Sequence, residues 1–344
     1  MSPFLRLSAT TNKRELENPA ESGSPVKKAK VGSDGLVALN NRHLVAKQEE
    51  AAARGEVFVD HLYHLGLDSS MPLQEQFGKT RFVVMGGSPV RALDVAQLVY
   101  QFMGVAAPQP IEPFGKTERY SMYNCQLGEV NVLSISHGMG QPSLSICLHE
   151  MAKLMHYAKA RNVAFIRVGT SGGVGVAPGT CVVAKSAVSG LLEPFYSLDI
   201  LGKTHQFPAN FDSQLADDIL ACAGDDIAAV AGITCGTDCF YEGQGRLDGM
   251  VADYSRDDKL AFLQKAHEAG VTNFEMESTC LAAQTSRWGI SAALVCTTLL
   301  NRLDGDQVTS TPEQLKQFSL NAQTLVLRYI KKQLIAEGLL PADA

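Results

Sequence analysis

Short apolar runs alternate along the chain with segments in which apolar residues recur every three to four positions. Residues 81–85 and 163–168 are short, mostly apolar runs, interrupted only by Arg81 and Arg167, and have the length typical of buried strands. After Pro142, by contrast, the apolar residues fall on one face at helical spacing: Leu144, Cys147, Leu148, Met151, Leu154, Met155 and Ala158. Strands that alternate with helices predict an α/β domain.

The remaining elements follow from the same patterns. Strands are predicted at 120–127, 130–136, 271–276 and 292–298, and helices at 91–103 and 279–288, the second ended by Gly289. The last helix opens with Thr311 as N-cap, Pro312 at the first helical position and Gln314 at the third. No period of 20–50 residues repeats, so we predict one folded domain at 56–337, between a mostly disordered N-terminal extension at 1–55 and a short tail at 338–344.

Charge is spread unevenly over these parts. Residues 1–30 hold six basic and three acidic side chains and so carry +3, which leaves −9 on the rest of a chain whose net charge is −6. An acidic body is a poor electrostatic match to nucleic acid. Lys13-Arg14 and Lys27-Lys28-Ala29-Lys30 resemble a bipartite nuclear-import signal. A solvated tail with incidental lysines is an equal alternative, and a mitochondrial presequence in residues 1–14 stays open.

The composition indicates the cellular compartment in which we expect the protein. With 45% hydrophobic and 19% charged residues the chain is typical of soluble proteins, and its longest mostly apolar run, 290–300, is too short to span a bilayer. The eight cysteines show no C-x-x-C pair and no Cys/His cluster at ligand spacing. We therefore expect reduced thiols, no zinc site, no membrane partner and a cytoplasmic location.

Two glycine-rich segments that follow strands each carry an arginine. Gly87 and Arg91 follow the first strand, and Arg167 and Thr170 belong to the segment 167–173. Backbone N–H groups exposed at glycines, together with a guanidinium, suit an anion, although neither segment fits the dinucleotide or P-loop fingerprint. Arg167 is the sharper indication because an arginine inside an apolar strand needs a partner. A buried ion pair with a carboxylate is the alternative.

Two carboxylates stand at the end of a later strand. Glu275 and Glu277 flank Met276, and strand alternation is expected to send Met276 to the opposite face. A carboxylate can accept hydrogen bonds from both hydroxyls of a ribose diol. A capped helix start is the alternative reading of the same residues.

Gln244 and Arg246 lie two residues apart in a loop bounded by glycines. A glutamine amide can accept from N3–H of uracil and donate to O2, while an arginine donates to O4. Cytosine would place an amino donor against the arginine, so the pair favours uracil. A polar surface loop is the alternative.

At these residues the chain resembles the uridine phosphorylases, within the wider nucleoside phosphorylase family, over residues 58–334. The segments that carry the resemblance are Gly86-Gly87-Ser88-Pro89, Ser136-His137-Gly138-Met139-Gly140, 166–173, 240–249, 275–278 and 299–303. The resemblance implies a single domain whose mixed β-sheet forms a distorted barrel flanked by helices. It also implies phosphorolysis of uridine to uracil and ribose 1-phosphate, with inorganic phosphate as co-substrate and no metal or other cofactor.

The resemblance further implies a role for each site residue. The phosphate-binding positions are Gly87, Arg91, Arg119, Arg167 and Thr170; the ribose-binding positions are His64, Glu275, Met276 and Glu277; the base-binding positions are Phe240, Gln244, Arg246 and Arg302. Arg91, Arg167, Gln244 and Arg246 would carry the catalysis. His64 and Arg119 would serve the neighbouring subunit, so a homodimer is the expected minimum.

Three other functions fit parts of these observations. A purine or methylthioadenosine phosphorylase shares the implied fold, although Asn301-Arg302 stands where purine-cleaving relatives tend to carry Ser-Asp. A hydrolase would need a water-activating carboxylate more than several phosphate arginines. A non-catalytic nucleoside-binding relative would keep the pocket without turnover. Acceptance of thymidine or deoxyuridine, and dimer against hexamer, stay open.

Overall fold

The computed structural model describes residues 35–39, 41–115 and 119–342. Its main sheet has eight strands: β3 (Thr80–Gly86), β4 (Met122–Gln126), β5 (Asn131–Ser136), β6 (Ala164–Gly173), β7 (Cys181–Ser189), β10 (Ala229–Gly236), β11 (Val271–Glu275) and β12 (Ser291–Asn301). Two hairpins stand apart from it: β1 (His61–Leu62) with β2 (Leu67–Asp68), and β8 (Phe195–Ile200) with β9 (Lys203–Pro208).

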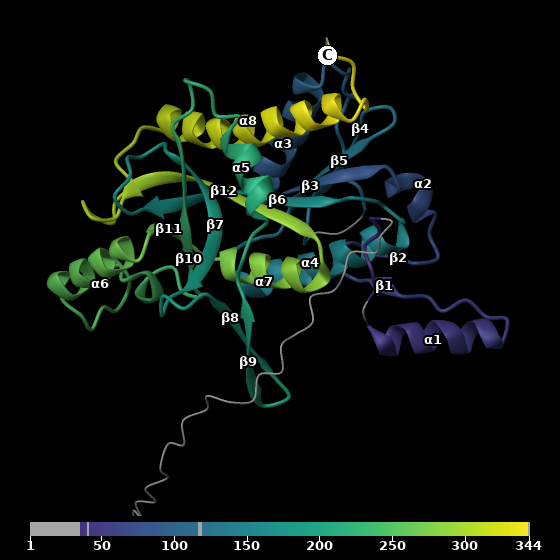
Figure 1. Ribbon diagram of the computed structural model, residues 1–344, viewed down its shortest axis with the longest axis horizontal. Coiled ribbons are helices and arrows are strands. Elements are labelled where there is room, and N and C mark those ends of the chain that lie inside the picture. The colour runs from purple at the N-terminus through teal and green to yellow at the C-terminus, as the bar shows by residue number, and fades with distance from the viewer. Residues whose placement is uncertain (1–34, 40, 116–118, 343–344) are drawn as a thin grey trace, which may run out of the picture.

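The sheet closes on itself over part of its width. Its strand order is β11-β10-β7-β12-β6-β3-β5-β4, and β11 pairs in addition with β6. The five strands from β11 to β6 thus form a barrel, which β3, β5 and β4 extend as an open wing (Figure 1). Pairing is parallel at β3–β5, β3–β6 and β6–β12 but antiparallel at β7–β12 and β6–β11. The predicted mixed sheet with a distorted barrel is confirmed.

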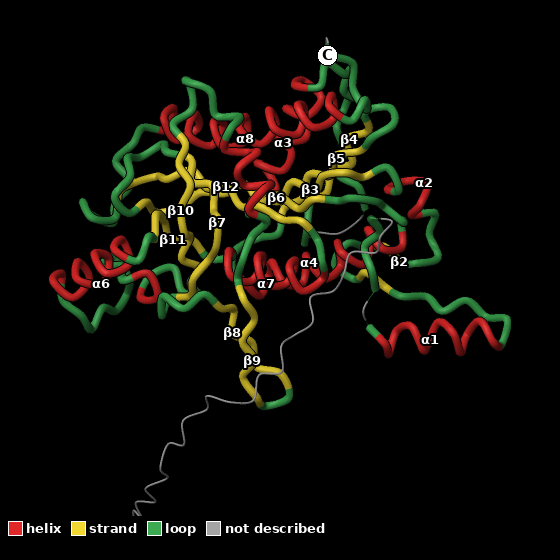
Figure 2. Tube along the Cα trace, viewed as in Figure 1, coloured by secondary structure: helices red, strands yellow, loops and turns green. Residues whose placement is uncertain are grey.

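Helices cover both faces of this sheet (Figures 1 and 2). On one side lie α3 (Pro89–Phe102), α5 (Ser213–Leu220) and α8 (Pro312–Ala336); on the other lie α4 (Gln141–Tyr157) and α7 (Ser278–Trp288). The remaining helices are α1 (Arg42–Ala53), α2 (Leu73–Phe77), α6 (Arg256–Glu268) and the short 3₁₀ helix η1 (Glu242–Gln244).

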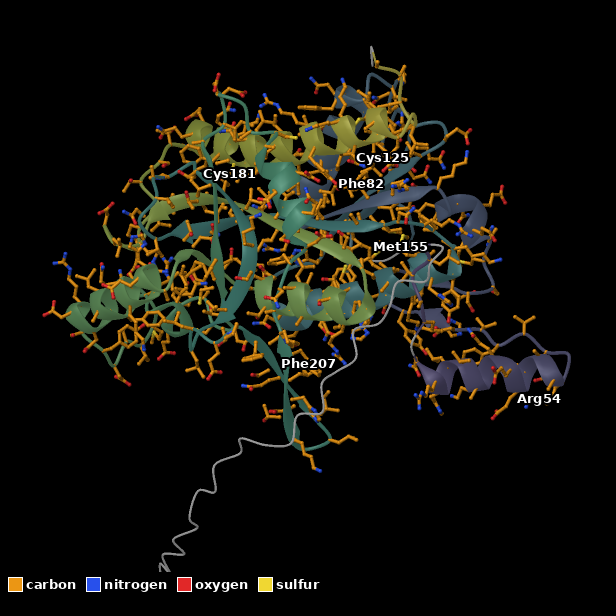
Figure 3. The ribbon with its side chains drawn as sticks, in the orientation of Figure 1. Arg54, Phe82, Cys125, Met155, Cys181 and Phe207 are labelled. Carbon is orange, nitrogen blue, oxygen red and sulfur yellow. The ribbon has the colours of Figure 1, made fainter. Side chains whose placement is uncertain are left out.

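The alternation of side chains along the strands builds two cores. On β3, Phe82 and Val84 pack with α3 and α8, whereas Val83 and Met85 pack with α4. Figure 3 labels Phe82 in the first core and Met155 in the second. A strand buried on both faces explains why residues 82–85 are all apolar. All eight cysteines are free thiols and most are buried.

Most elements with a strong pattern form where they are predicted. Thr311 accepts from the backbone N–H of Gln314 in a full capping box ahead of α8, and Gly289 ends α7 with a φ of 70°. The pattern did not reveal β7 to β10, α5 or α6. One reason is that β8 and β9 are largely exposed, so they lack a buried run that would mark them.

One local prediction is wrong. The glycine-rich segment 167–173 does not follow the predicted strand but is part of it, because β6 continues through Gly173. Gly172 and Gly173 pair with β11 and close the barrel. A Cβ on Gly173 would lie 2.9 Å from Val176 Cγ2, and one on Gly169 would lie 2.5 Å from Arg167 Nη1. These glycines permit close packing inside a strand, as glycine does where another group approaches the backbone.

The N-terminal extension is not uniformly without structure. Within the predicted span 1–55, residues 42–53 form α1, which Asn41 caps by accepting from the N–H groups of His43 and Leu44. Helix-favouring residues and this cap outweighed the low hydrophobicity on which the prediction rested. The two basic clusters lie outside the described residues. No helix in the described part of the chain is both long and apolar enough to span a bilayer.

Candidate active site

A cavity of about 180 Å³ lies where the C-terminal ends of β3, β6, β11 and β12 meet. Most of the predicted site residues line it: Gly87, Arg91, Arg167, Thr170, Phe240, Gln244, Arg246, Glu275, Met276 and Glu277. Arg119, His64 and Arg302 do not. Segments from Gly87 to Val308 thus supply one pocket, and no local pattern could have shown that they meet.

Arg91 stands at one corner of the cavity, in the first turn of α3. The N-terminus of a helix offers unpaired N–H groups and a positive dipole end. Gly87 allows the neighbouring loop to come close, because a Cβ there would lie 3.0 Å from the carbonyl oxygen of Gly138. Burial, and then repulsion from Arg167, lower the pKa of Arg91.

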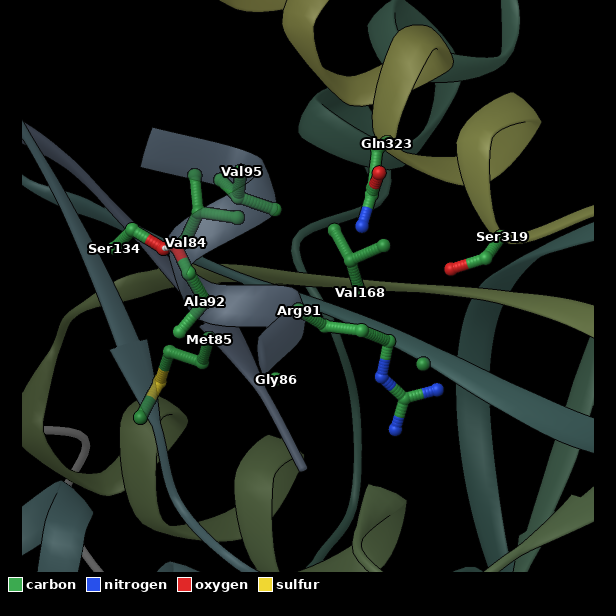
Figure 4. Close-up of a pocket in the computed structure, with 11 residues that line it drawn as sticks. Val84, Met85, Gly86, Arg91, Ala92, Val95, Ser134, Val168, Ser319 and Gln323 are labelled. Carbon is green, nitrogen blue, oxygen red and sulfur yellow. Dashed lines mark hydrogen bonds between the residues drawn. The ribbon is translucent and has the colours of Figure 1, made fainter. Parts of the chain in front are cut away.

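The guanidinium of Arg91 has few partners of its own. Its buried Nε has no hydrogen-bond partner, and Arg91 forms no ion pair within the described part of the chain. In Figure 4 its side chain extends past Val168, with Ser319 and Gln323 of α8 on the other side of that residue. A cation held this way is available to an anionic ligand.

Arg167, in contrast, is held by two carboxylates. Its Nη1 lies 3.2 Å from Glu275 Oε2, and its Nη2 pairs with Glu277 Oε2. Although burial opposes its charge, Glu277, Cys296 and Glu275 together raise the pKa of Arg167. The interpretation of Arg167 as part of a buried ion pair is therefore confirmed, and the same side chain also lines the cavity.

The two glutamates have different surroundings. Glu275 accepts from the backbone N–H groups of Glu277, at 2.9 Å, and Ser278, at 2.8 Å, so its carboxylate caps α7. Glu277 accepts from the N–H of Gly140 at 2.5 Å as well as from Arg167. Burial raises the pKa of Glu275 to about 7. Burial opposes ionisation of Glu277 too, but Arg167 and the Gly140 amide outweigh it and hold its pKa below the usual value.

Met276 does not point to the opposite face. It lines the same cavity as Glu275 and Glu277, contrary to the prediction from strand alternation. The physical reason is that β11 ends at Glu275, so the period of two no longer applies at the next residue.

His137 is a buried residue of the site to which the sequence assigned no role. Its Nε2 accepts from Arg167 Nε at 3.2 Å, and it is fully enclosed. Burial, and then repulsion from Arg167, lower the pKa of His137 to about 3, so the ring is neutral. A histidine directly after a buried strand, within Ser136-His137-Gly138, was the available signal.

Gln244 and Arg246 face the cavity from the loop after β10. Arg246 donates to Asp248 through Nε at 2.8 Å and Nη2 at 2.5 Å, and its guanidinium carbon lies 4.5 Å from the centre of the Phe240 ring. Both side chains are buried although residues 240–243 of the same loop are exposed, so these two residues do not project into solvent as those of a polar surface loop would.

Arg302 lies behind Gln244 and not at the surface of the cavity, where it was expected. Its exposed fraction is 0%, and its Nη2 donates to the backbone oxygen of Gln244 at 2.8 Å. Its Nη1 lies 3.4 Å from Gln244 Oε1. Arg302 therefore contacts Gln244 from behind instead of forming the cavity wall, which corrects the expectation of a base-binding position.

His64 and Arg119 lie away from this cavity. The His64 ring bonds through Nδ1 to Glu150 Oε1 at 2.7 Å, and Arg119 is on the exposed surface. Among the described residues, no group of three or more His, Cys, Asp or Glu side chains is arranged to hold a metal ion.

Known proteins similar to this chain share its fold and most of its length. The family model described as Phosphorylase superfamily matches residues 81–331. Uridine phosphorylase 1 of Mus musculus is 39% identical over 307 residues, covering 88% of this chain and 94% of the relative. Uridine and thymidine phosphorylase of Caenorhabditis elegans is 43% identical over 277 residues, covering 80% and 91%. A solved structure from a study of two uridine phosphorylases of Phytophthora capsici superposes with a TM-score of 0.80 at 37% identity, covering 88% and 99%.

Proposed function

The chain belongs to the phosphorylase superfamily, and from that membership we propose that it cleaves uridine with inorganic phosphate to give uracil and ribose 1-phosphate. One observation carries the proposal. A single cavity joins an arginine-lined corner, at Arg91, to an amide and a guanidinium, at Gln244 and Arg246. An anion and a pyrimidine edge can therefore be bound on either side of one sugar.

Phosphate is proposed to bind at the Arg91 corner. Gly87 and Thr170 line the same cavity, and the N–H groups at the start of α3 add donors. Arg167 is offset by two carboxylates, so Arg91 supplies most of the uncompensated positive charge. Arg167 then holds the glutamates in place, and its side chain lines the cavity that the ligand would occupy.

Ribose is proposed to lie against Glu277 and Met276. Each oxygen of Glu277 takes one donor from the protein, from Gly140 and from Arg167. A carboxylate oxygen accepts two hydrogen bonds, so one position on each oxygen remains for a ribose hydroxyl. The apolar side chain of Met276 packs against the sugar.

The base is proposed to bind between Gln244 and Arg246, with Phe240 against its ring. In the reaction an oxygen of hydrogen phosphate forms the bond to C1′ while the bond from C1′ to N1 breaks, and the electron pair of that bond goes to the uracil ring. The proton that the phosphate loses on becoming an ester balances the proton that uracil gains at N1. Negative charge then develops on O2 and O4, where Gln244 and Arg246 donate. Donors placed in advance at developing charge commonly contribute about 10²–10³ in rate each. No metal or organic cofactor enters this scheme.

A homodimer with shared sites is proposed as the active form. His64 and Arg119 lie outside their own cavity, as residues that serve a neighbouring subunit would. Glu150 accepts from His64 and from its backbone N–H, which fixes the ring on the surface. The free thiols suit a reducing compartment, and we place the protein in the cytoplasm on that ground.

Uracil release from uridine by the purified protein, with and without inorganic phosphate, tests the proposal. We expect release only with phosphate, and formation of ribose 1-phosphate in equal amount. Release without phosphate would indicate a hydrolase, and preference for inosine over uridine would indicate a purine phosphorylase. Absence of turnover with uracil binding retained would indicate a non-catalytic relative. Thymidine and deoxyuridine, assayed beside uridine, define the range of substrates.

A further inference from the structure

A buried carboxylate, Asp306, connects three segments of the chain behind the base-binding end of the cavity. Its side chain is 7% exposed. Oδ1 lies 2.7 Å from Lys259 Nζ on α6 and 2.9 Å from Arg302 Nε. Oδ2 accepts from the backbone N–H of Leu247 at 3.0 Å. Asp306 thus receives one donor each from α6, from the segment after β12 and from the loop that carries Arg246.

Both base-facing residues are connected to Asp306, Gln244 through the carboxylate and Arg302, and Arg246 through the backbone oxygen. Arg302, oriented by Asp306, donates to the backbone oxygen of Gln244 and approaches its side-chain oxygen. The backbone oxygen of Asp306 itself accepts from Arg246 Nη2 at 3.0 Å. No other described carboxylate pairs with Arg302.

Charge explains why the connection matters. Lys259 and Arg302 are both buried cations, and Asp306 lies between them. Removing the shared carboxylate would leave two buried positive charges near each other without compensation. Repulsion from Lys259 would then displace the Arg302 side chain, and its hydrogen bonds to Gln244 would be lost.

The orientation of the Gln244 amide depends on that hold. Because Arg302 Nη1 is a donor, it favours the amide oxygen on its side. That oxygen keeps a second lone pair for N3–H of uracil, while the amide nitrogen donates to O2. A reversed amide would set a donor against N3–H. An orientation that is only partly populated weakens binding by the fraction of molecules that hold it.

We propose that Asp306 is a positioning residue that fixes the uracil-binding residues: through Arg302 it sets the amide of Gln244, and through Leu247 and its own backbone it holds Arg246. The inference rests on the proposed function, since it concerns the same cavity. Asp306 does not line that cavity and is not a catalytic residue. Its effect is confined to the base, because Arg91 and Gly87 belong to other segments.

The test compares Asp306→Asn with Asp304→Asn. Asp304 is an exposed carboxylate on the same segment, whose hydrogen bond goes to Asn301 instead of to the uracil-binding loop. For each variant and the unchanged protein, KM is measured for uridine at saturating phosphate and for phosphate at saturating uridine. The dissociation constant for uracil is measured by calorimetry, and the melting temperature is recorded.

For Asp306→Asn we expect uridine KM and the uracil dissociation constant to rise at least tenfold, while phosphate KM stays within twofold. Asp304→Asn should match the unchanged protein, and Asp306→Glu, which keeps the charge, should retain more uracil affinity than Asn. A change in uridine KM below twofold, or an equal rise in both KM values, overturns the inference.

Lys259→Met keeps the inference testable if Asp306→Asn fails to fold. It removes the donor on α6 that holds Asp306 Oδ1 in place. The carboxylate and the Arg302 side chain bound to it then become less fixed, so uridine KM should rise at least threefold with phosphate KM unchanged. Unchanged uridine KM would count against the positioning role. If the unchanged protein neither binds uracil nor releases it from uridine, the proposed function itself fails, and that result is seen without any variant.

Discussion

Replacing Arg91 with alanine should weaken phosphate binding without unfolding the protein. Arg91 lines the cavity, its Nε has no partner, and no ion pair holds it within the described residues. Arg167 repels it, so its removal also relieves an unfavourable interaction. The substitution should therefore lower the affinity for phosphate and leave the stability of the protein almost unchanged.

The magnitude follows from one charge-assisted contact. Such contacts contribute roughly 1.5–3 kcal/mol net. At about 1.4 kcal/mol per factor of ten, phosphate KM should rise about 10- to 150-fold. The free energy of unfolding should change by less than about 1 kcal/mol, as for other substitutions that break no buried pair. Arg91→Lys keeps the charge without the planar fork and should fall between alanine and arginine.

The assay is the initial rate of uracil release as phosphate is varied at saturating uridine, with urea unfolding measured on the same preparations. Arg81→Ala is the matched control, because Arg81 lies at the other end of β3, where it pairs with Glu337. Its phosphate KM should not change. A phosphate KM for Arg91→Ala within threefold of the unchanged protein would refute the assignment of Arg91 to the anion.

Three further changes test other parts of the site. Arg246→Ala should lower kcat/KM for uridine by about 10²–10³; near-normal turnover would remove Arg246 from the base. Arg167→Met leaves two buried carboxylates uncompensated, so urea unfolding should show a loss of about 3–5 kcal/mol; a loss below about 1 kcal/mol would contradict the ion pair. His137 has its pKa lowered from 6.5 to about 3, so its contribution to stability is present above pH 6.5 and lost as pH falls towards 3. By pH 5 that loss is about 2 kcal/mol. Between pH 7.5 and 5, the free energy of urea unfolding of His137→Gln should therefore fall by about 2 kcal/mol less than that of the unchanged protein. Equal falls for the two proteins would exclude this role of His137.

The parts of the fold that sequence predicts are those in which each residue's environment repeats along the chain. β3 is buried on both faces, and its central residues are all apolar. The start of α8 is marked in the sequence by the capping residues Thr311 and Gln314. β8 and β9 lack such a run because most of their side chains face solvent. The closure of β11 onto β6 could not be read either, since it joins Phe274 to Gly172, about a hundred positions away.

The composition of the site was more predictable than its layering. The types of side chain, and the loops that carry them, follow from strand ends and from the resemblance, and the structure brings most of them to one cavity. How deeply each side chain is buried, and whether it lines the cavity or lies behind it, does not follow from these features. Arg302 and Arg246 are both arginines in polar segments, yet one is fully buried behind Gln244 and the other lines the cavity. The two arginines also differ in their carboxylate partners, Asp306 for Arg302 and Asp248 for Arg246, and these pairings are not visible in the sequence.

Arg167 shows that a structural and a functional interpretation need not exclude each other. The sequence set a bound anion against a buried ion pair, and the ion pair is present. Yet Glu277 would not be held in the cavity as an ionised carboxylate without that arginine, because burial alone opposes its charge. The pair thus maintains a carboxylate acceptor for ribose next to the Arg91 corner that attracts phosphate. Because Glu277 is paired with Arg167, Arg91 stays available to the phosphate. A buried ion pair of this kind is a component of the binding site, and its effect on stability and its effect on the ligand have the same physical origin.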